Sequence, residues 1–141
     1  MGFLPDQVHE EILVLSEQGD LLMEKGRYPD AVEAFTAALV KLPEPVEQWE
    51  AFVWLKASIG DALFFMQDYS RALSEFFEAA NGPDGAQNAF VILRLGECLY
   101  EQENSDALDY LCKAYFLEGV DIFRGQDKKY FSAVESVLGM A

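Results

Sequence analysis

The chain has 141 residues, of which 51% are hydrophobic, and a formal net charge of −15 at pH 7. This length suffices for one hydrophobic core and is too short for two domains of ordinary size, so we expect a single domain over residues 1–141. The acidic excess lies in residues 1–111, where it would repel nucleic-acid phosphates and anionic membranes and favour a basic partner, although acidity can also serve solubility alone.

The first predicted pair of helices spans residues 7–25 and 30–42. Pro29 fits the first turn of the second helix, because its missing N–H would have no helical partner there. Pro43 and Pro45 then end that helix, since proline also disfavours helical backbone in the residue before it. The apolar or small residues that share the inner faces of this pair are Leu15, Gly19, Leu22, Ala31, Phe35, Ala38 and Leu39.

A thinner copy of this pattern recurs twice downstream. The third helix is predicted over residues 46–67, and we expect its Gly60 to be pressed against Ala72 of the following helix. The turn at residues 81–85 ends this second pair, and a third pair follows around Gly96. The residues that repeat the inner faces are Phe52, Leu55, Ile59, Leu63, Phe76, Ala79, Ile92, Leu95, Leu99, Ala107, Leu111 and Ala114.

Residues 120–125 are predicted to form a short connector, and residues 126–138 a closing helix whose apolar side chains lie on one stripe. An array of repeated helices needs an atypical terminal element, because its last repeat would otherwise expose an apolar face. We therefore expect residues 126–138 to cap the array.

The segment LSEQGDLLMEKGRYPDAVEAFTAALVKLP, residues 15–43, resembles a tetratricopeptide repeat (TPR), a pair of antiparallel helices that recurs about every 34 residues. This resemblance implies an all-α fold, a right-handed solenoid of about seven antiparallel helices that acts by binding protein. The implied repeats are residues 12–45, 53–84 and 89–118, approximately, followed by a capping helix at about 126–138. Gly60 follows Gly19 by 41 residues, so we expect an insertion between the first two repeats, at the prolines.

In arrays of this type the first helix of each pair lines a concave groove. Each of these helices has an acid directly after its packing glycine, and we expect Asp20, Asp61 and Glu97 to form a ladder of carboxylates up the groove. Carboxylates beside aromatic rings suit Arg and Lys, through charge-assisted hydrogen bonds and cation–π contacts. In the alternative interpretation the aromatics belong to the core and the acids are merely solvated. The candidate partner-binding residues are Asp20, Glu24, Trp54, Asp61, Phe64, Phe65, Phe90, Glu97, Tyr100 and Glu101.

One familiar TPR subtype, the co-chaperones that bind the acidic C-termini of heat-shock chaperones, uses a clamp of Lys, Asn and Arg in this groove. The corresponding face of this chain offers Ser16, Asp20 and Asp61, with Arg94 as the nearby cation. We expect an acidic tail to be repelled, because like charges would meet.

The tail AYFLEGVDIFRGQDKKYFSAV, residues 114–134, resembles the ending of small bacterial TPR proteins that are encoded beside polymorphic toxins and act as their immunity partners. The residues that carry this resemblance are Ala114, Tyr115, Gly119, Ile122, Phe123, Lys129, Tyr130 and Phe131. It implies a stoichiometric inhibitor of a basic toxin or effector, such as a nuclease. The alternative is a cytoplasmic secretion chaperone or assembly adaptor that holds a client segment in the groove. The sequence leaves the partner and the oligomeric state open, a homo-oligomer included.

Little in the chain offers catalytic or metal-binding chemistry. His9 is the single histidine, and Cys98 and Cys112 lack the spacing of a metal-binding pair, so we expect thiols that are buried rather than ligands. We predict a protein without enzymatic activity, cofactor or metal. The N-terminus lacks the features of a secretory signal and no apolar run approaches the roughly 18 residues of a membrane span, so we expect a cytoplasmic location.

Overall fold

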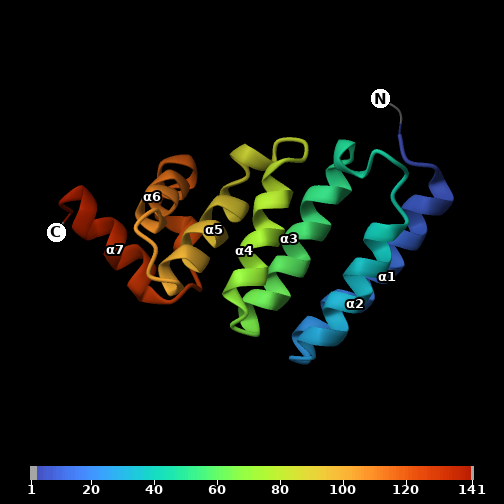
Figure 1. Cartoon of the computed structure of the whole chain (residues 1–141), viewed down its shortest axis with the longest axis horizontal. Helices are drawn as coiled ribbons and strands as arrows, with labels where there is room; N and C mark the ends of the chain where they lie inside the picture. Colours follow the sequence, from blue (N-terminus) through green and yellow to red (C-terminus); the bar gives the residue numbers. More distant parts are fainter. Residues whose placement is uncertain (1–2, 141) are drawn as a thin grey trace.

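The computed structural model describes residues 3–140, and within them the chain is helical without any strand (Figure 1). The elements are α1 (Asp6–Glu24), α2 (Tyr28–Val40), η1 (Val46–Gln48), α3 (Glu50–Phe65), α4 (Tyr69–Ala80), η2 (Gly85–Gln87), α5 (Ala89–Glu101), α6 (Ala107–Glu118), η3 (Val120–Phe123) and α7 (Lys128–Leu138), where η denotes a 3₁₀ helix. The predicted all-α architecture with about seven helices is confirmed over the described residues.

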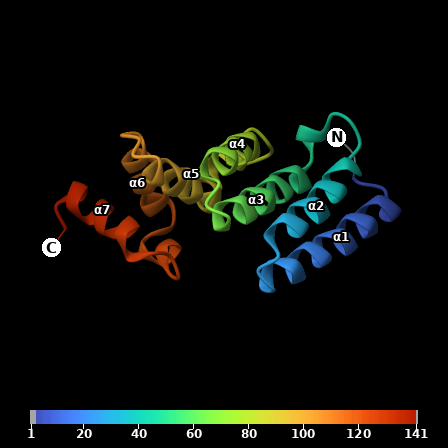
Figure 2. The same ribbon diagram turned by 60° about the horizontal axis from the view of Figure 1, so that its bottom comes forward.

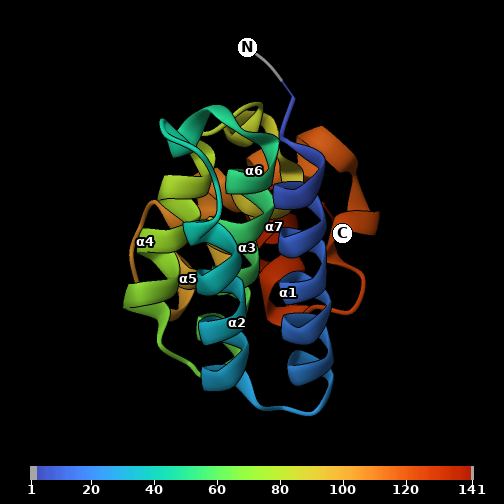
Figure 3. The same cartoon turned by 90° about the vertical axis from the view of Figure 1, so that its right-hand side faces the viewer.

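The helices form antiparallel pairs that stack along one axis. α1 packs with α2, α3 with α4 and α5 with α6, while α2 and α4 also pack against the first helix of the following pair. The two termini lie at opposite ends of this stack (Figure 2). Seen along the stack, α1 and α7 lie on one side and α2 and α4 on the other (Figure 3).

Gly19 and Gly60 allow the two helices of their pairs to approach closely. A Cβ atom at Gly19 would lie 2.5 Å from the ring of Phe35, and one at Gly60 would lie 2.8 Å from the ring of Phe76. The predicted close contacts are therefore present, but the nearest neighbour of Gly60 is Phe76 rather than Ala72. The aromatic ring fills the space that a missing side chain leaves, which fixes the crossing of the two helices.

Side chains in the preceding turns cap the N-termini of α4 and α5. Asp68 accepts a hydrogen bond from the backbone N–H of Arg71 at the start of α4, and Asn88 accepts one from Val91 at the start of α5. Each bond satisfies a donor that the helix itself leaves without a partner. Pro29 lies in the first turn of α2, as its fixed φ angle predicts.

The insertion between the first two repeats changes the start of the third helix. Residues 46–48 form the short η1, Trp49 is extended, and α3 begins at Glu50 rather than at residue 46 as predicted. The indole Nε1–H of Trp49 donates to the carbonyl of Pro43 over 2.8 Å, which holds the linker folded against itself. The long single helix of the prediction is wrong because this bond and the 3₁₀ turn compete with helix extension.

The C-terminal segment folds back after α6. Gly119, whose φ is +76°, ends α6, and η3 then buries Phe123 before α7 packs against α6 with Tyr130 and Val134 inward. The capping helix predicted at 126–138 is thus α7. Within residues 3–140 no helix is long and apolar enough to cross a membrane.

Candidate functional site

Along the face that the repeat pattern assigns to the groove, the side chains become less exposed from α1 and α3 to α5. On α1, Glu24 is exposed, and on α3 Trp54 and Phe65 are 38% and 47% exposed. On α5, by contrast, Leu93 and Glu97 are completely buried. The predicted groove is therefore open along α1 and α3 and closed along α5.

The C-terminal segment closes the face of α5. Tyr130 of α7 packs its ring edge-on against Tyr100, with the ring centroids 5.4 Å apart. Its hydroxyl also donates to Glu101, and Lys129 forms a 2.7 Å ion pair with the same carboxylate. Two predicted groove residues, Tyr100 and Glu101, are thus half-buried contacts of the cap.

Arg94 occupies the centre of the closed part. Its guanidinium donates to Asp61 Oδ1 over 2.7 Å, to Glu97 Oε1 over 2.6 Å and to Gln126 Oε1 over 2.8 Å. The predicted ladder of three available carboxylates is therefore wrong at two positions, because Asp61 and Glu97 neutralise a buried cation.

Aromatic rings surround this cation. The Arg94 guanidinium carbon lies 4.3 Å from the ring centroid of Phe64, 5.0 Å from that of Phe90 and 5.3 Å from that of Phe65. Phe64 and Phe90 are half-buried and pack on the core, so the core interpretation holds for them. Of the three, Phe65 remains exposed, and it also stacks on Tyr28 at 5.7 Å.

The titration of the buried acids follows from their surroundings. Burial raises the pKa of Glu97 from its ordinary value of 4.5 to about 7, against the opposing charge of Arg94. Burial likewise raises the pKa of Asp61, again opposed by Arg94. One carboxylate oxygen of Glu97, Oε2, has no hydrogen-bond partner among the described residues. Both carboxyl groups share one guanidinium, so a proton on Glu97 relieves the excess negative charge.

The two candidate acids of α1, Asp20 and Glu24, differ from Asp61 of α3 and Glu97 of α5, because they stay in solvent. Asp20 and Glu24 are exposed, and neither forms an ion pair within residues 3–140. Partial burial raises the pKa of Asp20, and the negative charges of Glu24 and Glu17 add to this effect. We call Asp20, Glu24, Trp54 and Phe65 the open acidic face. Its four members are the predicted site residues that are exposed.

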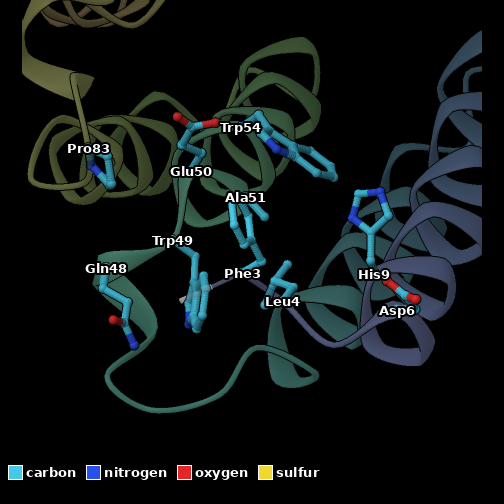
Figure 4. A pocket seen from close by; sticks show the side chains of 10 residues that line it. All are labelled: Phe3, Leu4, Asp6, His9, Gln48, Trp49, Glu50, Ala51, Trp54 and Pro83. Carbon is cyan, nitrogen blue, oxygen red and sulfur yellow. The ribbon is translucent and has the colours of Figure 1, made fainter. Parts of the chain in front are cut away.

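A cleft of about 600 Å³ lies beside Trp54, between the start of α1 and the start of α3 (Figure 4). Figure 4 shows the Trp54 indole pointing toward His9. We call it the N-terminal cleft, and its main walls are Phe3, Leu4, Asp6, Trp49, Glu50 and Trp54. Sequence reasoning missed five of these six. The available signal was the inserted linker, with a tryptophan directly before the next helix.

The cysteines and the remaining acids offer no metal site. Cys98 is buried, and burial raises the pKa of its thiol to about 12. Cys112 is half-buried rather than buried. Across residues 3–140, His, Cys, Asp and Glu side chains form no group of three or more that could hold a metal ion.

No protein-family model and no curated protein matches this sequence. Among solved structures, the chain is similar to the second TPR domain of the human RPAP3 protein, determined by NMR in complex with the HSP70 peptide SGPTIEEVD. The TM-score is 0.69 at 15% sequence identity, and the match covers 93% of this chain and 98% of that one. At this identity the similarity shows the fold.

Proposed function

We propose that this chain, which has a TPR fold, is a non-enzymatic module that binds a basic protein segment on its open acidic face. One observation carries the proposal: Asp20 and Glu24 are exposed and form no ion pair within residues 3–140, and Trp54 and Phe65 of α3 are exposed as well. α1 and α3 run in the same direction across the stack, so Glu24 and Phe65, in their last turns, lie toward the same edge of it, whereas Trp54 lies near the start of α3 (Figure 1).

A cation from a partner would suit this face for two reasons. It would offset the mutual repulsion of Asp20, Glu24 and Glu17, which adds to the effect of partial burial in raising the pKa of Asp20. A guanidinium or ammonium group could also lie over an exposed aromatic ring while it pairs with a carboxylate. The net charge of −15 would accelerate encounter with such a partner.

The structurally similar TPR domain was solved with a peptide that ends in two glutamates, a valine and an aspartate. In this chain Arg94 is the cation that the repeat pattern places near the groove, and it is paired with Asp61 and Glu97. Arg94 is therefore not available to pair with a carboxylate of an acidic peptide. We therefore propose the opposite charge preference for this chain.

The proposed biological role is that of an immunity protein, which neutralises a basic cognate toxin or effector such as a nuclease in the cytoplasm. Its support is the resemblance of the tail together with the acidity of residues 1–111. Part of the tail match has a structural explanation, since Tyr130 and Phe123 are buried and hold the cap in place. The alternative is a cytoplasmic secretion chaperone or assembly adaptor. In that role the open acidic face would hold an extended client segment, which it suits equally well.

Co-expression with the products of neighbouring genes tests these roles. If the chain is an immunity protein, one of those products should be toxic alone, and the chain should abolish the toxicity and co-purify in a defined complex. If the chain is a chaperone, the neighbour should instead be insoluble alone and should remain unfolded or secretion-competent in the complex. Failure of every basic neighbour to bind would contradict the proposal.

A further inference from the structure

The inserted linker forms part of the N-terminal cleft. Trp49 ends η1 in an extended conformation, and its indole is fixed by the 2.8 Å hydrogen bond to the Pro43 carbonyl. The Trp49 ring therefore forms one wall of the N-terminal cleft. Leu4 of the N-terminal segment lines the same cleft. The N-terminal cleft is thus lined by residues of the linker, the N-terminal segment and α3.

The cleft combines apolar walls with an acidic rim. Its floor and sides are contributed by Leu4, Trp49 and Trp54, while Asp6 and Glu50 stand at its edge. Both carboxylates are exposed, and neither takes part in an ion pair in the part of the chain that the structure describes. No Lys or Arg is among the residues that line it. A volume of about 600 Å³ lies within the range of protein ligand sites.

We propose that the N-terminal cleft receives a bulky apolar side chain of the partner segment, flanked by an Arg or Lys that pairs with Asp6 or Glu50. This inference rests on the proposed function, and it adds the anchor that the open acidic face does not provide. Trp54 belongs to both surfaces, so one extended segment can occupy the cleft and continue along α1 and α3. The apolar anchor supplies burial, and the flanking cation supplies orientation.

Charge complementarity selects this occupant over the others. A second copy of this chain would bring a further charge of −15 toward an acidic rim, and a nucleic acid would bring phosphates. A basic segment with an apolar side chain satisfies both the walls and the rim.

The test uses the full chain and a short synthetic peptide with one phenylalanine between two arginines in a glycine–serine background. Two matched peptides replace the phenylalanine by serine or both arginines by glutamate. Binding is followed by NMR, with the indole N–H signals of Trp49 and Trp54 as local reporters.

Three variants of the chain are compared with the wild type. The cleft variant carries Asp6→Asn and Glu50→Gln, and the groove variant carries Asp20→Asn and Glu24→Gln. The control variant carries Asp109→Asn and Glu118→Gln, which removes the same number of charges at exposed positions of α6. Equal thermal melting of all variants verifies that they fold.

We expect the arginine–phenylalanine peptide to shift both indole signals. The cleft variant should bind it roughly fivefold to tenfold more weakly, since two exposed charge pairs are lost, while the control variant should bind as the wild type does. The serine peptide should bind the wild type at least about tenfold more weakly, because an aromatic side chain is no longer buried. The glutamate peptide should not bind.

Other outcomes would overturn the inference in distinguishable ways. If the groove variant loses binding while the cleft variant keeps it, the open acidic face binds the partner and the cleft does not. If the serine peptide binds as well as the phenylalanine peptide, the cleft is no anchor site. If no variant differs from the wild type, both this inference and the proposed function are wrong. Self-association that the cleft variant abolishes and the peptide leaves intact would make the cleft an interface between copies, which also overturns it.

Discussion

Arg94 and Gln126 are 32 residues apart in the chain, and a 2.8 Å hydrogen bond from Arg94 Nη1 to Gln126 Oε1 joins them. The same guanidinium binds Asp61 of α3 and Glu97 of α5. One buried cation therefore connects two repeats with the segment that leads into the capping helix.

Replacement of Arg94 by alanine should destabilise the protein strongly. Asp61 and Glu97 would remain largely buried without a counterion, a situation that typically costs about 3–5 kcal/mol. Urea denaturation at pH 8, followed by circular dichroism, measures the loss. Arg71→Ala is the matched control, because Arg71 is exposed and its ion pair with the half-buried Asp68 at the surface should contribute less than about 1 kcal/mol. Equal losses in the two variants would contradict the structural role of Arg94.

The stability of the wild-type protein should carry a specific pH dependence from Glu97. Its pKa is about 7 in the folded chain and 4.5 ordinarily, so folding favours the protonated form. The contribution of Glu97 to the free energy of unfolding is complete below about pH 4.5 and is lost as pH rises through 7. Its size is roughly 3 kcal/mol at most. Arg94, Asp61 and Glu101 are the charged groups around it.

The Glu97→Gln variant isolates this contribution, because glutamine keeps the shape and removes the titration. Urea midpoints measured at several values between pH 5 and 8 should decline less steeply with rising pH in the variant than in the wild type. The remaining slope of the variant reports the other acids, Asp61 among them. Parallel slopes in the two proteins would show that Glu97 does not titrate in this range.

Gly60→Leu should overpack the contact between α3 and α4. A Cβ atom added at Gly60 would lie 2.8 Å from the Phe76 ring, so the larger side chain should cost roughly 1–3 kcal/mol or more. Thermal melting should detect a lower Tm. Thr36→Leu, at an exposed position of α2, is the control and should leave the Tm nearly unchanged. An unaltered Tm in Gly60→Leu would place Gly60 away from the helix crossing.

Binding of a basic cognate partner should weaken in the groove variant, Asp20→Asn with Glu24→Gln. Exposed charge pairs contribute roughly 0.2–1 kcal/mol each, so the double change should reduce affinity by about twofold to thirtyfold. Affinity should also decrease with added salt, more steeply in the wild type than in the variant. Titration of both proteins, and of the control variant on α6, at two salt concentrations measures this. Equal affinities and equal salt slopes would remove Asp20 and Glu24 from the binding surface.

Local patterns in the sequence were sufficient for the repeat architecture. The helices with their inner faces, the packing positions of Gly19, Gly60 and Gly96, and the turn around Pro29 all follow from residues three or four apart or from neighbours in a turn. The open acidic face was also within reach of such reasoning, because Asp20 and Glu24 need no distant residue to remain in solvent.

The availability of the other site residues was decided by tertiary structure alone. Asp61 and Glu97 carry the same pattern as Asp20, an acid after a packing glycine, yet they are taken up by Arg94 and covered by the segment around Gln126. The N-terminal cleft likewise required the linker around Trp49 to meet the start of α1. Periodicity records which face of a helix is apolar, but it holds no information on which distant segment will cover that face. That choice depends on the burial, charge and hydrogen bonds of side chains that only the folded chain brings together.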